Sequence, residues 1–271
     1  MFKKLMVYSM VLLLVLSLVL VGCTPKKEQN MTTITVAGST SVQPIAEQLA
    51  KKFSEKNPNV KIEVQGGGSS VGIKAAMEGT ADIGTSSREL KPEEKTVKEF
   101  MIAKDGIVVI VNPANKVDNL TLEQVKKIFT GEIKNWKEVG GEDLKITVIN
   151  REEGSGTRGA FEELVLGKGN TFTSDAILQG STGAVKSTVA GDKSAIGYIS
   201  LGSVDSSVKK VKVDGVEATE ETIINGTYKI SRPFLFLTKN DPTGAVKDFI
   251  DFVLSPEGQD IISKEGFVKV K

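Results

Sequence analysis

Three short segments place hydroxyl residues and glycine between a strand-like stretch and the start of a helical stretch. They are residues 38–41 (GSTS), 66–70 (GGGSS) and 154–157 (GSGT). A helix N-terminus presents backbone N–H groups that lack intrahelical acceptors, together with a partial positive charge, so each segment is a potential anion site. Ser and Thr are also ordinary N-caps, and one such segment alone would carry little weight. Three segments of this kind predict a shared anion-binding site, because ligands of open α/β sheets bind at the carboxyl ends of the strands.

Arginine next to the third segment strengthens this prediction. Arg151 precedes the GSGT turn and offers a full positive charge with forked donors suited to a tetrahedral oxyanion. Glu153 is placed to pair with Arg151 and hold its orientation, whereas Arg158 is expected to point to solvent. At the end of another strand-like stretch, Ser87 and its neighbours offer further hydroxyls, and we expect Arg88 to form a structural ion pair rather than to bind a ligand.

Composition excludes several kinds of chemistry. The 271 residues include no histidine and one cysteine, which removes Ser-His-Asp and Cys-His catalysis, histidine-ligated metals and internal disulfides. The 35 basic and 34 acidic residues give a formal net charge of +1, which argues against a nucleic-acid-binding protein. Residues 154–159 match the spacing G-x-G-x-x-G, but three residues separate the first glycine from its strand, so we reject a dinucleotide fingerprint.

The elements that must position these residues follow an α/β pattern. Strands, hydroxyl loops and helices alternate, which predicts a mainly parallel sheet. Continuous apolar runs at 106–111 (GIVVIV) and 234–237 (FLFL) are expected to cross between two α/β groups. The predicted strands are 33–37, 60–64, 81–85, 106–111, 144–150, 195–199, 208–213 and 234–237, and the predicted helices are 42–56, 71–79, 122–129, one that follows Thr157 and runs to 166, and 245–254.

The N-terminus resembles a lipoprotein export signal. Lys3 and Lys4 precede an apolar run over 5–21, and residues 20–23 (LVGC) resemble the bacterial lipobox, in which Cys23 would carry the lipid. We therefore expect residues 1–22 to be a signal peptide and residues 23–32 to be a flexible tether. The protein would then be anchored to the cell membrane on its extracytoplasmic side.

Five segments, in order, resemble one known family. They are residues 37–41 (AGSTS), 65–70 (QGGGSS), 81–88 (ADIGTSSR), 128–136 (IFTGEIKNW) and 151–157 (REEGSGT). Together they are similar to the phosphate-binding lipoproteins of the high-affinity phosphate ABC importer. The resemblance implies a two-lobed, type II periplasmic-binding-protein fold with a ligand cleft between the lobes. Residues 33–108 and 234–271 would form lobe I, and residues 109–233 would form lobe II.

The resemblance also implies which residues hold phosphate. One lobe would contribute Thr40, the Ser41 amide and Ser69, and the other would contribute Arg151, with Glu153 orienting it. The remaining ligands from the second lobe would be Ser155, Gly156 and Thr157. Ser87 stands where some members carry an Asp that accepts the proton of the ligand. We expect Ser87 to reject sulfate less strongly than an Asp would, because a hydroxyl can donate as well as accept.

We therefore interpret the chain as a solute-binding protein that captures inorganic phosphate for the permease subunits of an ABC importer. It is expected to be a monomer that needs no cofactor or metal and has no catalytic residues. Two alternatives stay open: a binder of sulfate, molybdate or tungstate, and an exported phosphatase. An adhesion or signalling module is a third, but it would need no closed anion cleft.

Overall fold

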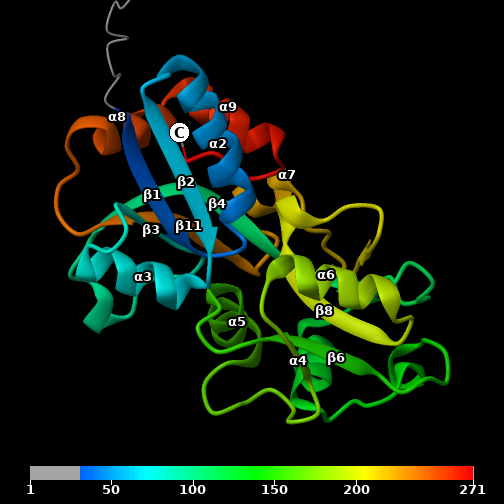
Figure 1. The fold of residues 1–271 in the computed structure, drawn as a ribbon. Coiled ribbons are helices and arrows are strands. Elements are labelled where there is room, and N and C mark those ends of the chain that lie inside the picture. The colour runs from blue at the N-terminus through cyan, green and yellow to red at the C-terminus, as the bar shows by residue number, and fades with distance from the viewer. Residues whose placement is uncertain (1–30, 271) are drawn as a thin grey trace, which may run out of the picture. The chain divides into compact units, whose positions relative to one another are not determined.

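The computed structural model describes residues 31–270, so the expected signal peptide and Cys23 lie outside the described residues. Within residues 31–270, a nine-stranded sheet has the order β2-β1-β3-β11-β4-β8-β6-β7, with β9 also paired to β4 (Figure 1). None of the helices in this range combines the length and the apolar character needed to cross a membrane.

The strands and helices have the following bounds. The strands are β1 (Thr32–Gly38), β2 (Val60–Gly66), β3 (Ile83–Ser86), β4 (Lys98–Val111), β5 (Asn119–Leu120), β6 (Thr147–Arg151), β7 (Ile177–Gln179), β8 (Ala195–Ser200), β9 (Lys209–Lys210), β10 (Lys212–Val213) and β11 (Ser231–Thr238). The helices are α2 (Gln43–Lys56), α3 (Ser69–Glu78), α4 (Leu122–Thr130), α5 (Gly156–Phe161), α6 (Thr182–Gly191), α7 (Glu220–Ile224), α8 (Gly244–Val253) and α9 (Pro256–Lys264). Short 3₁₀ turns lie at Pro92–Glu94, Trp136–Val139 and Leu201–Ser203, and a π turn lies at Glu162–Leu166.

The first lobe is built on the parallel strands β2, β1 and β3, with α2 and α3 as their crossover helices. Strand β11 runs antiparallel to β3, and its apolar run is buried on both faces. Phe234 and Phe236 join the core formed with α2, α8 and α9, whereas Leu235 and Leu237 join the core under α3. A strand covered on both faces must be apolar at every position, which explains the continuous FLFL run.

The second lobe has its own core. Strands β8, β6 and the last part of β4 are covered by α4, α5 and α6, and 32 buried residues, all but Val268 from residues 107–230, form one cluster there. Trp136 belongs to this cluster and is 1% exposed. Phe161 stacks on Tyr198 with ring centroids 4.1 Å apart, so an aromatic contact anchors the C-terminal end of α5 in this core.

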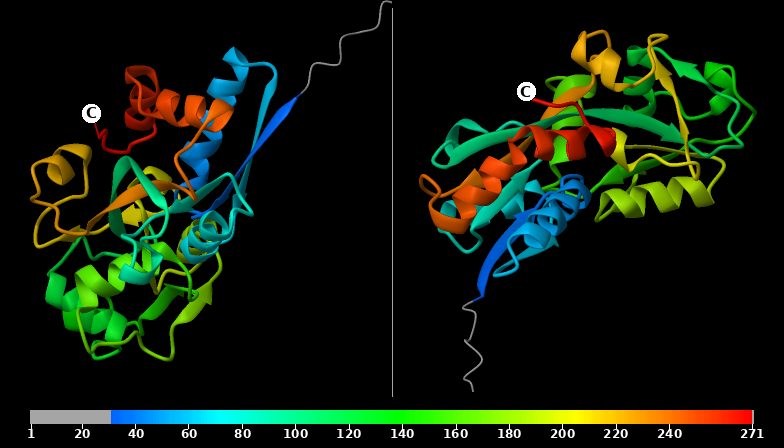
Figure 2. Two further views of the ribbon diagram at one scale, coloured as in Figure 1. Left: turned by 90° about the vertical axis from the view of Figure 1, so that its left-hand side faces the viewer. Right: turned by 90° about the horizontal axis from the view of Figure 1, so that it is seen from above.

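Strand β4 passes from one lobe to the other (Figure 2). It pairs with β11 as far as Gly106 and with β8 from Ile107 onward. The chain returns just before Ser231, because Ile230 still belongs to the core of the second lobe. The FLFL run therefore does not cross, contrary to the prediction, since all of β11 pairs with first-lobe strands. We propose lobe boundaries at Gly106–Ile107 and Ile230–Ser231, slightly earlier than the boundaries expected from the sequence.

Candidate anion site between the lobes

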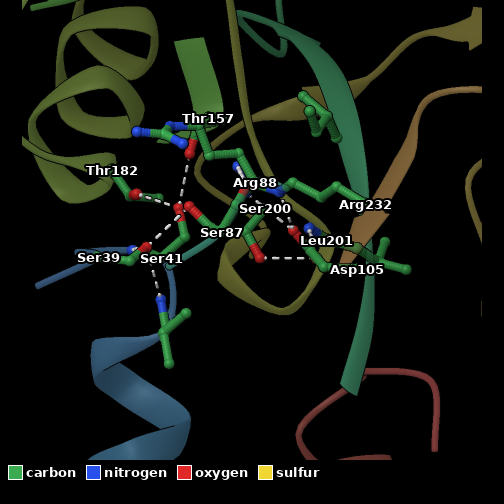
Figure 3. Close-up of polar contacts among 12 residues, drawn as sticks. Ser39, Ser41, Ser87, Arg88, Asp105, Thr157, Thr182, Ser200, Leu201 and Arg232 are labelled. Atoms are coloured by element: carbon green, nitrogen blue, oxygen red, sulfur yellow. Dashed lines mark hydrogen bonds and ion pairs between the residues drawn. The ribbon is translucent and has the colours of Figure 1, made fainter. Parts of the chain in front are cut away.

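Hydroxyl groups from the two lobes meet in one cluster (Figure 3). Ser41, just before α2 of the first lobe, lies 2.9 Å from Thr157 Oγ1 and 2.9 Å from Thr182 Oγ1 of the second lobe, measured from its Oγ. Thr40 Oγ1 also accepts from the Thr182 amide at 3.3 Å. Ser41, Thr157 and Thr182 are buried, at 4% exposure or less. Residues more than a hundred positions apart in the chain therefore share a single polar centre.

A second group of hydroxyls lies on the first-lobe side. The Ser87 amide donates to Ser69 Oγ at 3.0 Å, and Ser39 Oγ donates to Ser87 Oγ at 2.8 Å. The Ser69 and Ser87 hydroxyls are 3.3 Å apart. Three separate loops of the first lobe, after β1, β2 and β3, thus contribute serines to one spot, because the carboxyl ends of parallel strands share a sheet edge.

The hydroxyl groups lie at the N-termini of helices that begin close to the carboxyl ends of the strands. Helices α2 and α3 of the first lobe and α6 of the second lobe start at Gln43, Ser69 and Thr182 (Figure 1). Their partial positive ends favour an anion between them. Thr182 was missed by the sequence analysis, although residues 180–182 (GST) repeat the pattern of glycine and hydroxyls before a helix. Ser39 lies within the first predicted segment but was not singled out.

The two lobes approach closely around Gly156. A Cβ added to Gly156 would lie 2.1 Å from Ser69 Oγ and 2.8 Å from Ser87 Oγ, both on the other lobe. Nearby, the Ser70 amide donates to the carbonyl of Gly154 at 3.0 Å. Glycine is therefore required in the third segment for close approach of the lobes.

Arg151 is almost fully buried at the end of β6, with 1% exposure. Its Nε donates to the Gln179 carbonyl at 2.9 Å and its Nη2 to the Gly180 carbonyl at 3.2 Å. Within residues 31–270, no acceptor is found for Nη1. Burial lowers the pKa of Arg151, but a guanidinium stays charged in proteins. These contacts tie the cation to the loop that leads into Thr182.

The base of Arg151 is held by a buried network. The Arg151 amide donates to Asn150 Oδ1 at 2.7 Å, and the same oxygen accepts from the Tyr198 hydroxyl. Burial raises the pKa of Tyr198, so this hydroxyl remains a donor. Arg158 Nη1 donates to the Arg151 carbonyl at 3.2 Å, and its guanidinium lies over the Phe172 ring. The expectation that Arg158 points to solvent is therefore wrong.

Two other expected roles differ from the structure. Glu153 is exposed, and no hydrogen bond or ion pair joins it to Arg151 among the described residues; main-chain carbonyls orient the guanidinium instead. The Ser41 amide, expected to face the ligand, donates to Ser39 Oγ at 3.2 Å. Ser155 is buried, and its Oγ accepts from the Arg158 amide at 3.3 Å, so it caps α5. Gly156 and Thr157 are also buried.

Arg88 forms the expected ion pair at the edge of this region. Its Nη1 and Nη2 donate to the two carboxylate oxygens of Glu94 at 2.7 and 2.8 Å, and the side chains are 10% and 15% exposed. The hydrogen bond from Arg88 lowers the pKa of Glu94. Gly159 of the second lobe leaves room for Arg88, whose Cδ would lie 3.2 Å from a Cβ added there.

Glu94→Gln is expected to destabilise the protein by about 1–3 kcal/mol at pH 7, because a charge-assisted pair is lost. A carboxyl with a lowered folded-state pKa contributes stability above its unfolded pKa, and this contribution disappears as the pH falls through the folded-state pKa. Urea unfolding of both proteins should therefore give a difference at pH 7 that shrinks toward pH 3. Glu55→Gln, in the exposed pair with Lys52, is the control and should show no resolvable difference. A difference for Glu94→Gln that does not change with pH would contradict this role.

Comparison with known proteins assigns the class of this fold and site. A family model described as "PBP superfamily domain" matches residues 24–257. The phosphate-binding protein PstS of Borreliella burgdorferi is 36% identical over 259 residues, covering 91% of this chain and 93% of that protein. The protein is thus a two-lobed binding protein of the PBP superfamily. More narrowly, the chain belongs to the PstS family of phosphate-binding proteins.

Solved structures agree with this assignment. A substrate-binding protein of a putative phosphate ABC transporter from Clostridium perfringens, solved with bound phosphate, is 52% identical with a TM-score of 0.87. The alignment covers 89% of this chain and all of that one. An ABC-type phosphate transport receptor from Vibrio cholerae is 41% identical with a TM-score of 0.72, over 87% and 99% of the two chains. The predicted α/β, two-lobed fold and the family resemblance are confirmed.

Proposed function

We propose that this protein captures inorganic phosphate and delivers it to the permease of an ABC importer. The observation that carries the proposal is the cluster of hydroxyls contributed by both lobes, with the buried Arg151 anchored beside it. Neutral donors and one guanidinium suit a small, doubly charged oxyanion, because each oxygen needs several donors and the charge needs partial compensation. The relatives named above, which are described as phosphate-binding proteins, support this choice of ligand.

In this proposal, the ligand lies between the helix N-termini and replaces some of the hydroxyl–hydroxyl contacts. Arg151 supplies the charge, and Ser87 accepts the proton of hydrogen phosphate. The other proposed ligand groups are the side chains of Thr40, Ser41, Ser69, Ser155 and Thr157 and the backbone of Gly156. Thr182 joins this set because its hydroxyl touches Ser41 at 2.9 Å. The lobes would open about the crossings near Gly106 and Ser231, which are single-chain connections suited to hinge motion.

The cellular setting is part of the same proposal. The protein is exported, lipidated at Cys23 and held on the extracytoplasmic face of the cell membrane, where it meets the permease as a monomer. It acts by binding and release, not as an enzyme. The motif at residues 20–23 and the apolar run before it support the lipid anchor.

Isothermal titration of extensively dialysed protein with phosphate tests this function. We expect saturable binding of one phosphate per chain, and we expect sulfate to compete far more weakly. Molybdate and tungstate in the same competition test the alternative oxyanions, and a phosphatase assay with and without Mg²⁺ or Zn²⁺ tests the enzymatic alternative. Tighter binding of another oxyanion, or turnover of a phosphate ester, would overturn the proposal.

A further inference from the structure

A buried ion pair lies where the chain crosses between the lobes. Arg232, at the start of β11, donates from Nε and Nη2 to Asp105 Oδ2 at 3.1 and 2.9 Å, and the two side chains are 1% and 0% exposed. Asp105 precedes Gly106, the last residue of β4 that pairs with β11. Ion pairs this deeply buried contribute little net stability, because desolvation offsets their attraction. The role of the Asp105–Arg232 pair therefore follows from its geometry and not from its energy.

Asp105 also binds the second lobe. Its Oδ1 accepts from the Ser200 hydroxyl at 2.8 Å and from the Leu201 amide at 3.1 Å, at the end of β8. One carboxylate thus connects β4, β8 and, through Arg232, β11 (Figure 3). The carboxylate that binds the Arg232 guanidinium is therefore itself held by groups from the second lobe.

The remaining nitrogen of Arg232 reaches the proposed ligand site. Its Nη1 donates to the Ser87 carbonyl at 3.0 Å. The Ser87 amide is bound to Ser69 Oγ, and its hydroxyl accepts from Ser39 Oγ. Ser87 is therefore held through its amide, its carbonyl and its side chain. The contact from Arg232 holds the carbonyl side of the Ser87–Arg88 peptide, whose N–H donates to Ser86 Oγ at 3.3 Å, and this peptide adjoins the Cα that bears the Ser87 hydroxyl.

We infer that Arg232 is a positioning residue for ligand selectivity: by holding the Ser87 carbonyl, it keeps the Ser87 hydroxyl where it accepts the proton of hydrogen phosphate. This inference rests on the proposed function, in which Ser87 is the acceptor. An acceptor distinguishes hydrogen phosphate from sulfate only when it faces the P–OH group, because sulfate has no proton to donate at neutral pH. A small rotation of this peptide would weaken phosphate binding while leaving sulfate binding unchanged.

The contact needs the forked shape of arginine. Arg232 donates to a carboxylate and to a carbonyl in different directions at the same time. Lysine would keep the positive charge beside Asp105, but its compact ammonium cannot reproduce this planar fork. Arg232→Lys therefore removes the contact that positions Ser87 while it keeps the positive charge beside Asp105.

The experiment is a double-mutant cycle read out as the ratio of phosphate to sulfate affinity at neutral pH. We expect Arg232→Lys and Ser87→Ala each to lower this ratio about three- to tenfold, corresponding to about 0.7–1.4 kcal/mol. The double variant should show no further fall, because alanine removes the hydroxyl that Arg232 positions. Effects that multiply in the double variant, or an unchanged ratio in either single variant, would overturn the inference.

Two further variants serve as the control and as the substitute if Arg232→Lys does not fold. Arg88→Lys breaks the fork to Glu94 at the cleft edge and is the matched control, which should lower stability without changing the ratio. If Arg232→Lys does not fold, the neutral pair Asp105→Asn/Arg232→Gln avoids an unpaired buried charge and still removes the fork to Ser87; it should lower the ratio equally. An unchanged ratio in that folded variant would also overturn the inference. A wild-type protein that binds no phosphate would instead contradict the proposed function itself.

Discussion

Replacing Arg151 with alanine is expected to abolish measurable phosphate binding while the fold survives. Truncating one partner of a buried charge-assisted pair costs about 2–5 kcal/mol, which corresponds to a loss of affinity of at least about thirtyfold. The fold should survive because Gln179 and Gly180, whose carbonyls Arg151 binds, are only half-buried and exposed, respectively, and water can replace the guanidinium. Isothermal titration and urea unfolding of the same preparation measure both effects.

Two companion variants make this result specific. Arg151→Lys keeps the charge but loses the fork, and it should retain weak binding. Lys137→Ala makes the same charge change on the surface of the second lobe, where the ammonium pairs with Asp143 at 3.0 Å, and it should bind phosphate within about threefold of wild type, as expected when no ligand contact is lost. Affinity similar to wild type in folded Arg151→Ala would exclude this site.

Gly156→Ala is expected to prevent the lobes from closing. The new Cβ would lie 2.1 Å from Ser69 Oγ and 2.8 Å from Ser69 Cβ on the other lobe, and Ser69 is fully buried. Relieving such an overlap costs about 1–3 kcal/mol, so phosphate affinity should fall by roughly five- to more than a hundredfold. The φ of Gly156 is not in the left-handed region, and alanine is the better helix former, so unfolding stability should be unchanged or slightly higher.

Small-angle scattering measures directly whether the lobes of the Gly156→Ala variant close. Saturating phosphate should reduce the radius of gyration of the wild type but not of Gly156→Ala. Gly183→Ala, in the first turn of α6, is the control. The nearest atom to its added Cβ is Ser181 Oγ at 4.0 Å, so this methyl group overlaps with nothing. The prediction would be refuted if Gly156→Ala bound phosphate as tightly as Gly183→Ala.

Local pattern was sufficient for most of the strands and helices and for three of the hydroxyl loops, but α6 and the first part of β4 were not predicted. The helix predicted over 122–129 is α4, and Thr121 and Gly131 cap its two ends, because capping depends on neighbours in the chain. The helix expected after Thr157 begins at Gly156 but changes at Glu162 into a π turn, which no periodicity indicated. The strand expected over 208–213 divides into two short strands, β9 and β10, with different partners.

The sequence by itself determined the α/β class, the family and three of the loops that supply hydroxyl groups. These features follow from residue types and spacings within short windows, where backbone geometry links sequence to structure directly. Only the tertiary structure decided which side chains meet. It placed Thr182 against Ser41. It also showed that main-chain carbonyls, and not Glu153, orient Arg151. Finally, it brought Arg232 to the Ser87 carbonyl, 145 positions away in the chain. Contacts between distant segments depend on sheet order and strand register, and a strand pattern alone specifies neither of them.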